Sequence, residues 1–204
     1  MNWVLAALAP LLLFGVLKIT GLPNPAIGSY HALCAVGIFC MRKRIRTLLA
    51  WGPTTGRWAL GTTVVFLAGL FAPLLFWSFA SIREMRAFFP WNSSEAAFLL
   101  FAAYTMLVHC PLEEIFWRGA VTSPDARVSV AIAGNAVFFY LLHAAAMTVS
   151  LGGKGWLIAV PAGLAGGGWA FVTARSRSLW PALLSHWAVD AGILGGMWFF
   201  FVKR

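Results

Sequence analysis

Seven long apolar runs account for most of this 204-residue chain. They lie near residues 3–17, 27–41, 59–80, 95–121, 134–151, 156–174 and 179–202. The hydrocarbon core of a bilayer is about 30 Å thick and takes roughly 20 helical residues to cross, so each run predicts a membrane-spanning helix. The runs lack the period-two alternation of outer-membrane strands, which argues against a transmembrane barrel. We therefore expect an all-α polytopic membrane protein, a bundle of about seven transmembrane helices.

The composition of the chain supports this class and argues against others. Hydrophobic residues make up 61% of the chain, charged residues 10%, and the mean hydropathy is +0.82, which excludes an ordinary soluble domain. The net charge of +9 does not indicate nucleic-acid binding, because the cations lie between the spans and form no basic stripe. Lys and Arg favour the cytoplasmic side, so the densest cluster predicts an N-terminus inside the cell. That cluster comprises Arg42, Lys43, Arg44, Arg46 and Arg57.

The connections between the runs are short and rich in Pro and Gly, which leaves no room for a second domain. We expect one transmembrane domain over residues 1–204, in which the spans of residues 1–94 precede core helices in residues 95–204 that carry the candidate site. Ser94 offers an N-cap to the run that begins at Glu95. The first run has no basic leader and no small-residue cleavage site, so it is expected to be a retained helix and not a cleaved signal peptide.

Charged residues at membrane depth are energetically costly and therefore mark candidate functional sites. Glu113 and Glu114 are adjacent in the fourth run, so on a helix their side chains point about 100° apart. Arg118 follows Glu114 by one turn on nearly the same face, which predicts an internal ion pair. This pairing leaves Glu113 to face a cavity as a proton-accepting base.

Three further polar residues lie in later runs. His143 is in the fifth run, and Phe139, one turn earlier on the same face, is expected to wall the same pocket. His186 and Asp190 share one face of the last run. The carboxylate can fix the tautomer of the imidazole, or both groups can hold a water or an anionic intermediate, and the spacing leaves both roles open.

The depth of His143 in the membrane constrains where the fifth helix begins. A helix that started at Arg127 would place His143 about 24 Å from its end, too far to meet Glu113. We therefore predict a start near Gly134, which places His143 about 13 Å deep, comparable with the histidine of the last helix. Residues 126–133 are then expected to form a separate interfacial helix.

In order along the chain, these residues form the motifs E-E-x-x-x-R, F-x-x-x-H and H-x-x-x-D, which resemble those of the CPBP family. This family comprises CAAX-processing endopeptidases of the Ras-converting type and bacterial homologues, including bacteriocin-processing and self-immunity (Abi) proteins. The resemblance covers about residues 111–192. It implies an intramembrane endopeptidase with its active site inside the membrane, in which Glu113 and His143 activate a water and His186 and Asp190 stabilise the oxyanion. Eukaryotic members commonly carry Asn at the last position, so the Asp is expected to act protonated or by orienting the histidine.

The resemblance also raises the question of a metal, since the family has often been labelled metalloprotease. We expect no cofactor, because H-E-x-x-H is absent and ligation by Glu113 would consume the base. The alternative is a Zn²⁺ site built from Glu113, His143, His186 and Asp190.

Three other polar side chains are not included among the predicted site residues. A Cys110 nucleophile is disfavoured, because the neighbouring carboxylates disfavour its thiolate. His31 and His109 are interpreted as structural, although His109 lies one turn from Glu113 and is placed to tune it.

We expect an endopeptidase that hydrolyses a peptide bond of a membrane-associated protein or peptide, with C-terminal tail processing as the favoured case. Its expected partners are the lipid bilayer and a membrane-anchored substrate with a sorting or lipidated tail, and its expected location is the bacterial plasma (inner) membrane. A non-catalytic bacteriocin self-immunity or membrane-binding protein is the main alternative. A proton-coupled transporter is a further one, although no internal repeat is evident.

Overall fold

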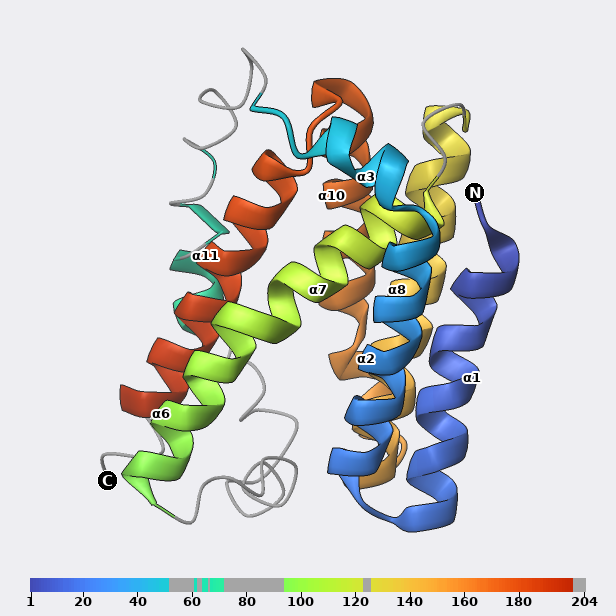
Figure 1. Ribbon diagram of the computed structural model, residues 1–204. Coiled ribbons are helices and arrows are strands. Elements are labelled where there is room, and N and C mark those ends of the chain that lie inside the picture. Colours follow the sequence, from blue (N-terminus) through green and yellow to red (C-terminus); the bar gives the residue numbers. More distant parts are fainter. Residues whose placement is uncertain (52–60, 62–63, 66, 72–93, 123–125, 200–204) are drawn as a thin grey trace.

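The computed structural model describes residues 1–51, 61, 64–65, 67–71, 94–122 and 126–199, and within them the chain is helical and contains no strand (Figure 1). This confirms the all-α prediction. The elements are α1 (Trp3–Thr20), α2 (Pro23–Cys40), α3 (Arg42–Leu48), α6 (Glu95–Tyr104), η1 (Thr105–His109), α7 (Cys110–Glu114), η2 (Ile115–Val121), α8 (Val128–Leu151), α9 (Lys154–Ile158), α10 (Val160–Ser176) and α11 (Trp180–Met197).

Several helices have the length and apolar surface that a bilayer requires, as expected of an integral membrane protein. Among the described residues, those long and apolar enough to cross a membrane are Trp3–Thr20, Glu95–Val121, Val128–Val149 and Lys154–Ser176. Two more 18-residue helices, α2 and α11, belong to the same bundle (Figure 1). Most of the predicted third span, together with Arg57, lies outside the described residues.

The long helix from Glu95 to Val121 runs obliquely through the bundle (Figure 1). Its middle element α7 contacts α2 and α11, while its last element η2 contacts α1, α2, α3 and α10. Behind it, α8 packs against both α1 and α10. The two adjacent glutamates of α7 are therefore surrounded by helices from both halves of the chain.

This long helix changes its winding on both sides of the glutamates. It begins as expected, with the Ser94 hydroxyl accepting a hydrogen bond from the Ala97 N–H at 3.1 Å. Two π-helical stretches, η1 and η2, then flank the single α-helical segment α7. Pro111 at the start of α7 has no N–H to donate to the preceding turn, which favours an irregular hydrogen-bond pattern there. π-helical turns are frequent at functional sites because they re-aim the side chains of a helix.

The start of α8 corrects the sequence-based prediction. The helix begins at Val128 and not near Gly134, and most of the residues expected to form a separate interfacial helix, 126–133, belong to its first turns. The prediction was wrong because it assumed that neighbouring helices begin at one level. Asn135 Nδ2 donates to Thr122 Oγ1 at 2.8 Å, so the end of η2 lies level with the third turn of α8.

The two candidate catalytic side chains still reach a common depth. His143 follows Asn135 by eight residues, or about 12 Å of α-helix. Glu113 precedes Thr122 by nine residues on the adjoining helix, which is a comparable distance. The first turns of α8 therefore project beyond η2 without separating the two side chains.

Glycines allow α10 to approach α8 closely. A Cβ atom added at Gly163 would lie 2.7 Å from Tyr140 Cβ, and one added at Gly166 would lie 2.8 Å from Phe139 Cβ. Small residues at such contacts are the usual means of close helix packing in membranes. The close approach brings the α10 side chain of Trp169 next to Phe139, with ring centroids 5.9 Å apart.

Candidate active site

Glu114 and Arg118 form a fully buried ion pair, as the spacing predicted. Arg118 Nη1 lies 3.0 Å from Glu114 Oε1, and neither side chain is exposed. The guanidinium also donates to the Gly166 carbonyl at 3.1 Å. It lies 4.9 Å from the ring centroid of Phe139 and 5.1 Å from that of Trp169, within cation–π range. The pair neutralises both charges inside the bundle and joins the long helix to α8 and α10.

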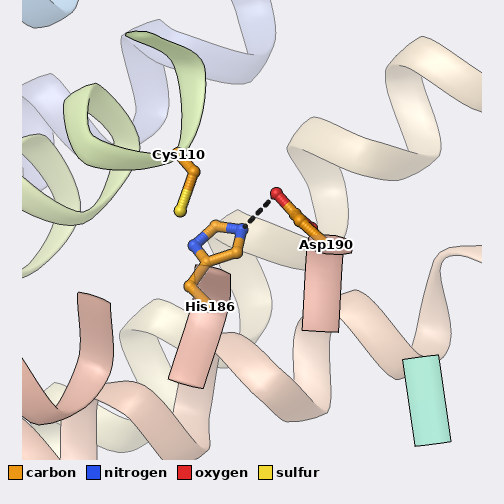
Figure 2. Close-up of side chains that lie close together, drawn as sticks. All are labelled: Cys110, His186 and Asp190. Carbon is orange, nitrogen blue, oxygen red and sulfur yellow. Dashed lines mark ion pairs between the residues drawn. The ribbon is translucent and has the colours of Figure 1, made fainter. Parts of the chain in front are cut away.

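His186 lies between two carboxylates. Its Nδ1 is 2.7 Å from Glu114 Oε1, and its Nε2 is 3.4 Å from Asp190 Oδ2, the ion pair drawn in Figure 2. The indole of Trp169 stacks on the imidazole with centroids 4.1 Å apart and planes 18° from parallel. Because the Glu114 carboxylate accepts the Nδ1–H, Nε2 is the nitrogen that faces the remaining space of the site.

Glu113 is 1% exposed, and its two carboxylate oxygens have different surroundings. Oε1 accepts a hydrogen bond from the Tyr30 hydroxyl at 2.9 Å, and that hydroxyl in turn accepts one from Trp117 Nε1 at 2.9 Å. Oε2 is buried and has no hydrogen-bond partner among the described residues. Its contact is His109 Nε2 at 3.7 Å. One oxygen is thus anchored, while the other remains able to accept a proton.

A chain of aromatic side chains leads from the surface to Glu113. Tyr104, which is 37% exposed, lies with its hydroxyl 2.7 Å from His31 Nδ1, and His31 Nε2 lies 2.9 Å from His109 Nδ1. One set of tautomers satisfies every contact: Tyr104 donates to His31, His31 donates to His109, and the His109 N–H faces Glu113. All donors then point towards the carboxylate. The two histidines interpreted as structural therefore belong to the surroundings of the candidate base.

His143 has a defined tautomer and a position near both acids. Its Nδ1 lies 2.9 Å from the Phe139 carbonyl, which can only accept, so Nδ1 carries the proton and the Nε2 lone pair is available. The ring of Phe139 lies 4.4 Å from that of His143 and 6.2 Å from that of His186, centroid to centroid. His143 is within range of direct electrostatic interaction with Glu113 and Asp190.

The predicted site residues therefore meet at one centre, with unequal access. Glu113, Glu114, Arg118 and His186 are buried, whereas the Asp190 side chain is 17% exposed and His143 is partly exposed.

Sequence reasoning missed three aromatic residues that hold this centre together: Tyr30, Trp117 and Trp169. Each contacts a site residue from a position that looked like ordinary apolar helix. Tyr30 was detectable in principle, because it is a phenol within an apolar run, and a buried hydroxyl needs a partner. Trp169 stands among glycines, and nothing in the sequence indicated that it stacks on a histidine.

The donor atoms of the site also fit a metal ion, in a set different from the expected alternative. Among the described residues, Cys110, His186 and Asp190 offer one ligand atom each, all within 4.8 Å of one another (Figure 2). Thiolate, imidazole and carboxylate together suit Zn²⁺. Glu113 and His143 are not members of this cluster, and Cys110 takes their place.

A membrane-embedded helical bundle with two glutamates, two histidines and an aspartate at one buried centre has the form of an intramembrane hydrolase. Residues 95–192 match the family model described as Type II CAAX prenyl endopeptidase Rce1-like. The match over this segment, just under half of the chain, confirms the resemblance to CAAX proteases seen in the motifs. A search of curated proteins and a search of solved structures give no match.

Proposed function

We propose that this protein is an endopeptidase of the bacterial inner membrane that hydrolyses a peptide bond of a membrane-anchored protein or peptide by metal-free glutamate catalysis. The observation that carries the proposal is the geometry of Glu113. Tyr30 holds one carboxylate oxygen, and the other is buried, without a hydrogen-bond partner among the described residues, and near His143. Such an oxygen is suited to take a proton from a water molecule.

The first chemical step follows from the two free acceptor atoms. A water between Glu113 Oε2 and His143 Nε2 donates to both, which orients one of its lone pairs towards the substrate. Glu113 takes one proton, and the oxygen attacks the carbonyl carbon of the peptide bond. The proton on Glu113 then passes to the amide nitrogen, the C–N bond breaks, and a carboxylic acid and an amine are released.

The negative charge of the tetrahedral intermediate needs a donor nearby. His186 is suited to this role, because Glu114 and Asp190 flank its ring and allow it to carry a proton on Nε2 as well as on Nδ1. An imidazolium N–H fixed before the reaction stabilises an oxyanion without reorganisation. In this proposal Asp190 orients His186 and does not touch the oxyanion, which accounts for an acid at this position.

The preference for metal-free catalysis rests on which residues could hold an ion. The candidate ligand cluster contains Cys110, His186 and Asp190 and leaves out Glu113 and His143. The proposed base and its partner histidine are therefore available to the water. Because His143 and Asp190 are partly exposed, we propose that the substrate enters beside them, and we propose C-terminal sorting or lipidated tails of membrane-anchored peptides as the substrate class.

Glu113→Gln tests the proposal, with Glu95→Gln as its matched control. Both residues lie on the long helix, but Glu95 is exposed at its first turn. We expect Glu113→Gln to lose at least about a hundredfold in hydrolysis of membrane-anchored peptides, and Glu95→Gln to match the wild type. Unchanged cleavage by a folded Glu113→Gln variant would show that Glu113 is not the base. Protection against a bacteriocin that survives this substitution would favour the immunity alternative.

A further inference from the structure

Cys110 is a buried thiol that the proposed reaction does not use, and it faces two groups that the reaction does use. Cys110 comes from α7, and His186 and Asp190 come from α11, one turn apart (Figure 2). Cys110 is fully buried, and the His186 side chain is 6% exposed. The ligand atoms of all three side chains lie within 4.8 Å of one another.

The separation of two of these atoms equals an edge of a zinc tetrahedron. Zn–N and Zn–O bonds of about 2.0–2.2 Å at a tetrahedral angle place the nitrogen and the oxygen about 3.4 Å apart. His186 Nε2 and Asp190 Oδ2 are 3.4 Å apart. The Cys110 sulfur lies within 4.8 Å of a nitrogen of the His186 ring and of the Asp190 carboxylate. A thiolate ligand of the same ion would lie about 3.6 Å from the coordinating nitrogen.

The surroundings of His186 are also those of a metal ligand. Its Nδ1–H donates to Glu114 Oε1 at 2.7 Å, and a ring whose other nitrogen is bound to a carboxylate presents its Nε2 lone pair for coordination. Glu114 is itself held by Arg118 at 3.0 Å, so the second carboxylate is fixed in place. A divalent ion bound by one thiolate and one carboxylate is electrically neutral, which a buried site tolerates best.

We propose that Cys110, His186 and Asp190 form a binding site for a borderline divalent metal ion of the zinc class, and that its occupation blocks hydrolysis. The inhibitory part rests on the proposed function. A metal on His186 Nε2 replaces the N–H that stabilises the oxyanion. It also binds the Asp190 carboxylate, which then no longer orients the His186 ring. On binding, the Cys110 thiol and the His186 Nε2 each lose a proton to solvent, and a sulfur–metal bond and a nitrogen–metal bond form. Glu113 and His143 stay outside the ligand set.

Co²⁺ is the probe for binding, because a tetrahedral cobalt thiolate has a charge-transfer band that other ligands do not give. We expect one equivalent of Co²⁺ to produce this band in the purified full chain, and Zn²⁺ to abolish it by displacement. Glu113→Gln should give the same titration. Cys110→Ser should lose the band and weaken binding by at least about a hundredfold, since loss of an outer-shell partner alone costs about 10–100-fold. Cys40→Ser, which removes an exposed thiol, is the control.

The absence of the band in the wild type, or its survival in Cys110→Ser, would overturn the site. Asp190→Asn provides a second variant: it keeps the thiol, so the band should remain while the affinity falls. In the activity assay, Zn²⁺ should inhibit the wild type and Cys40→Ser alike and require about a hundredfold more metal for Cys110→Ser. Stimulation by Zn²⁺, or equal inhibition of all three proteins, would contradict the inhibitory role. The Co²⁺ titration needs no hydrolysis and is repeated on Glu113→Gln. It therefore tests the metal site separately from the proposed function, even if Glu113→Gln still cleaves the peptide.

Discussion

Replacing Tyr30 with phenylalanine removes one hydroxyl group that makes two buried hydrogen bonds. The hydroxyl donates to Glu113 Oε1 and accepts from Trp117 Nε1, both at 2.9 Å. A hydrogen bond to a charged group contributes about 1.5–3 kcal/mol. If the bond serves to aim the carboxylate at the water, its loss lowers the hydrolysis rate by about 10- to 150-fold. The unpaired indole N–H lowers the free energy of unfolding by about 1–3 kcal/mol in addition.

Two measurements on Tyr30→Phe separate these effects. Cleavage of a membrane-anchored peptide at saturating substrate reports the rate, and thermal unfolding in detergent reports the stability. Tyr140→Phe on α8 is the matched control, because it also removes one tyrosine hydroxyl and its ring packs on that of Trp156, with centroids 6.0 Å apart. A rate within twofold of the wild type in Tyr30→Phe would refute the view that Tyr30 positions the base.

Two further predictions concern the framework of the site. Arg118→Leu leaves Glu114 buried without its arginine partner, so we expect the free energy of unfolding to fall by about 3–5 kcal/mol. Chemical denaturation measures this, and a wild-type value would contradict the buried ion pair. Gly166→Ala places a methyl group 2.8 Å from Phe139 Cβ, so we expect it to lower the free energy of unfolding by about 1–3 kcal/mol. Gly168→Ala is the control, because a Cβ atom there would have nothing within 4 Å, and we expect its thermal unfolding to match that of the wild type. Equal behaviour of the two alanine variants would argue against the close contact of α8 and α10.

The helical fold and the pairing within helices could be predicted from the sequence, because both depend on local spacing. The apolar run from Glu95 to Val121 and its Ser94 cap appear in the structure as expected. The Glu114–Arg118 pair also follows from spacing alone, since residues four apart share a helix face. These features need no knowledge of how the helices are arranged.

The contacts between helices could not be predicted in the same way. The level at which α8 begins depends on the bond from Asn135 to Thr122, which no periodicity in one helix reveals. The anchoring of Glu113 by Tyr30 joins residues 83 positions apart, and the stacking of Trp169 on His186 depends on the glycines that draw α10 inwards. Spacing identified the groups that carry charge, but not the aromatic residues that orient them.

The central claim is that Glu113 and His143 act on one water molecule, and a double-mutant cycle on hydrolysis tests it most directly. Thermal unfolding first shows that Glu113→Gln and His143→Gln are each folded. Either substitution by itself should then lower the rate by about 10²- to 10⁴-fold. Because either substitution disables the same step, the double variant should be no more than about tenfold slower than the slower single variant. Losses that multiply fully in the double variant would show that the two residues act independently, and would contradict the proposed mechanism.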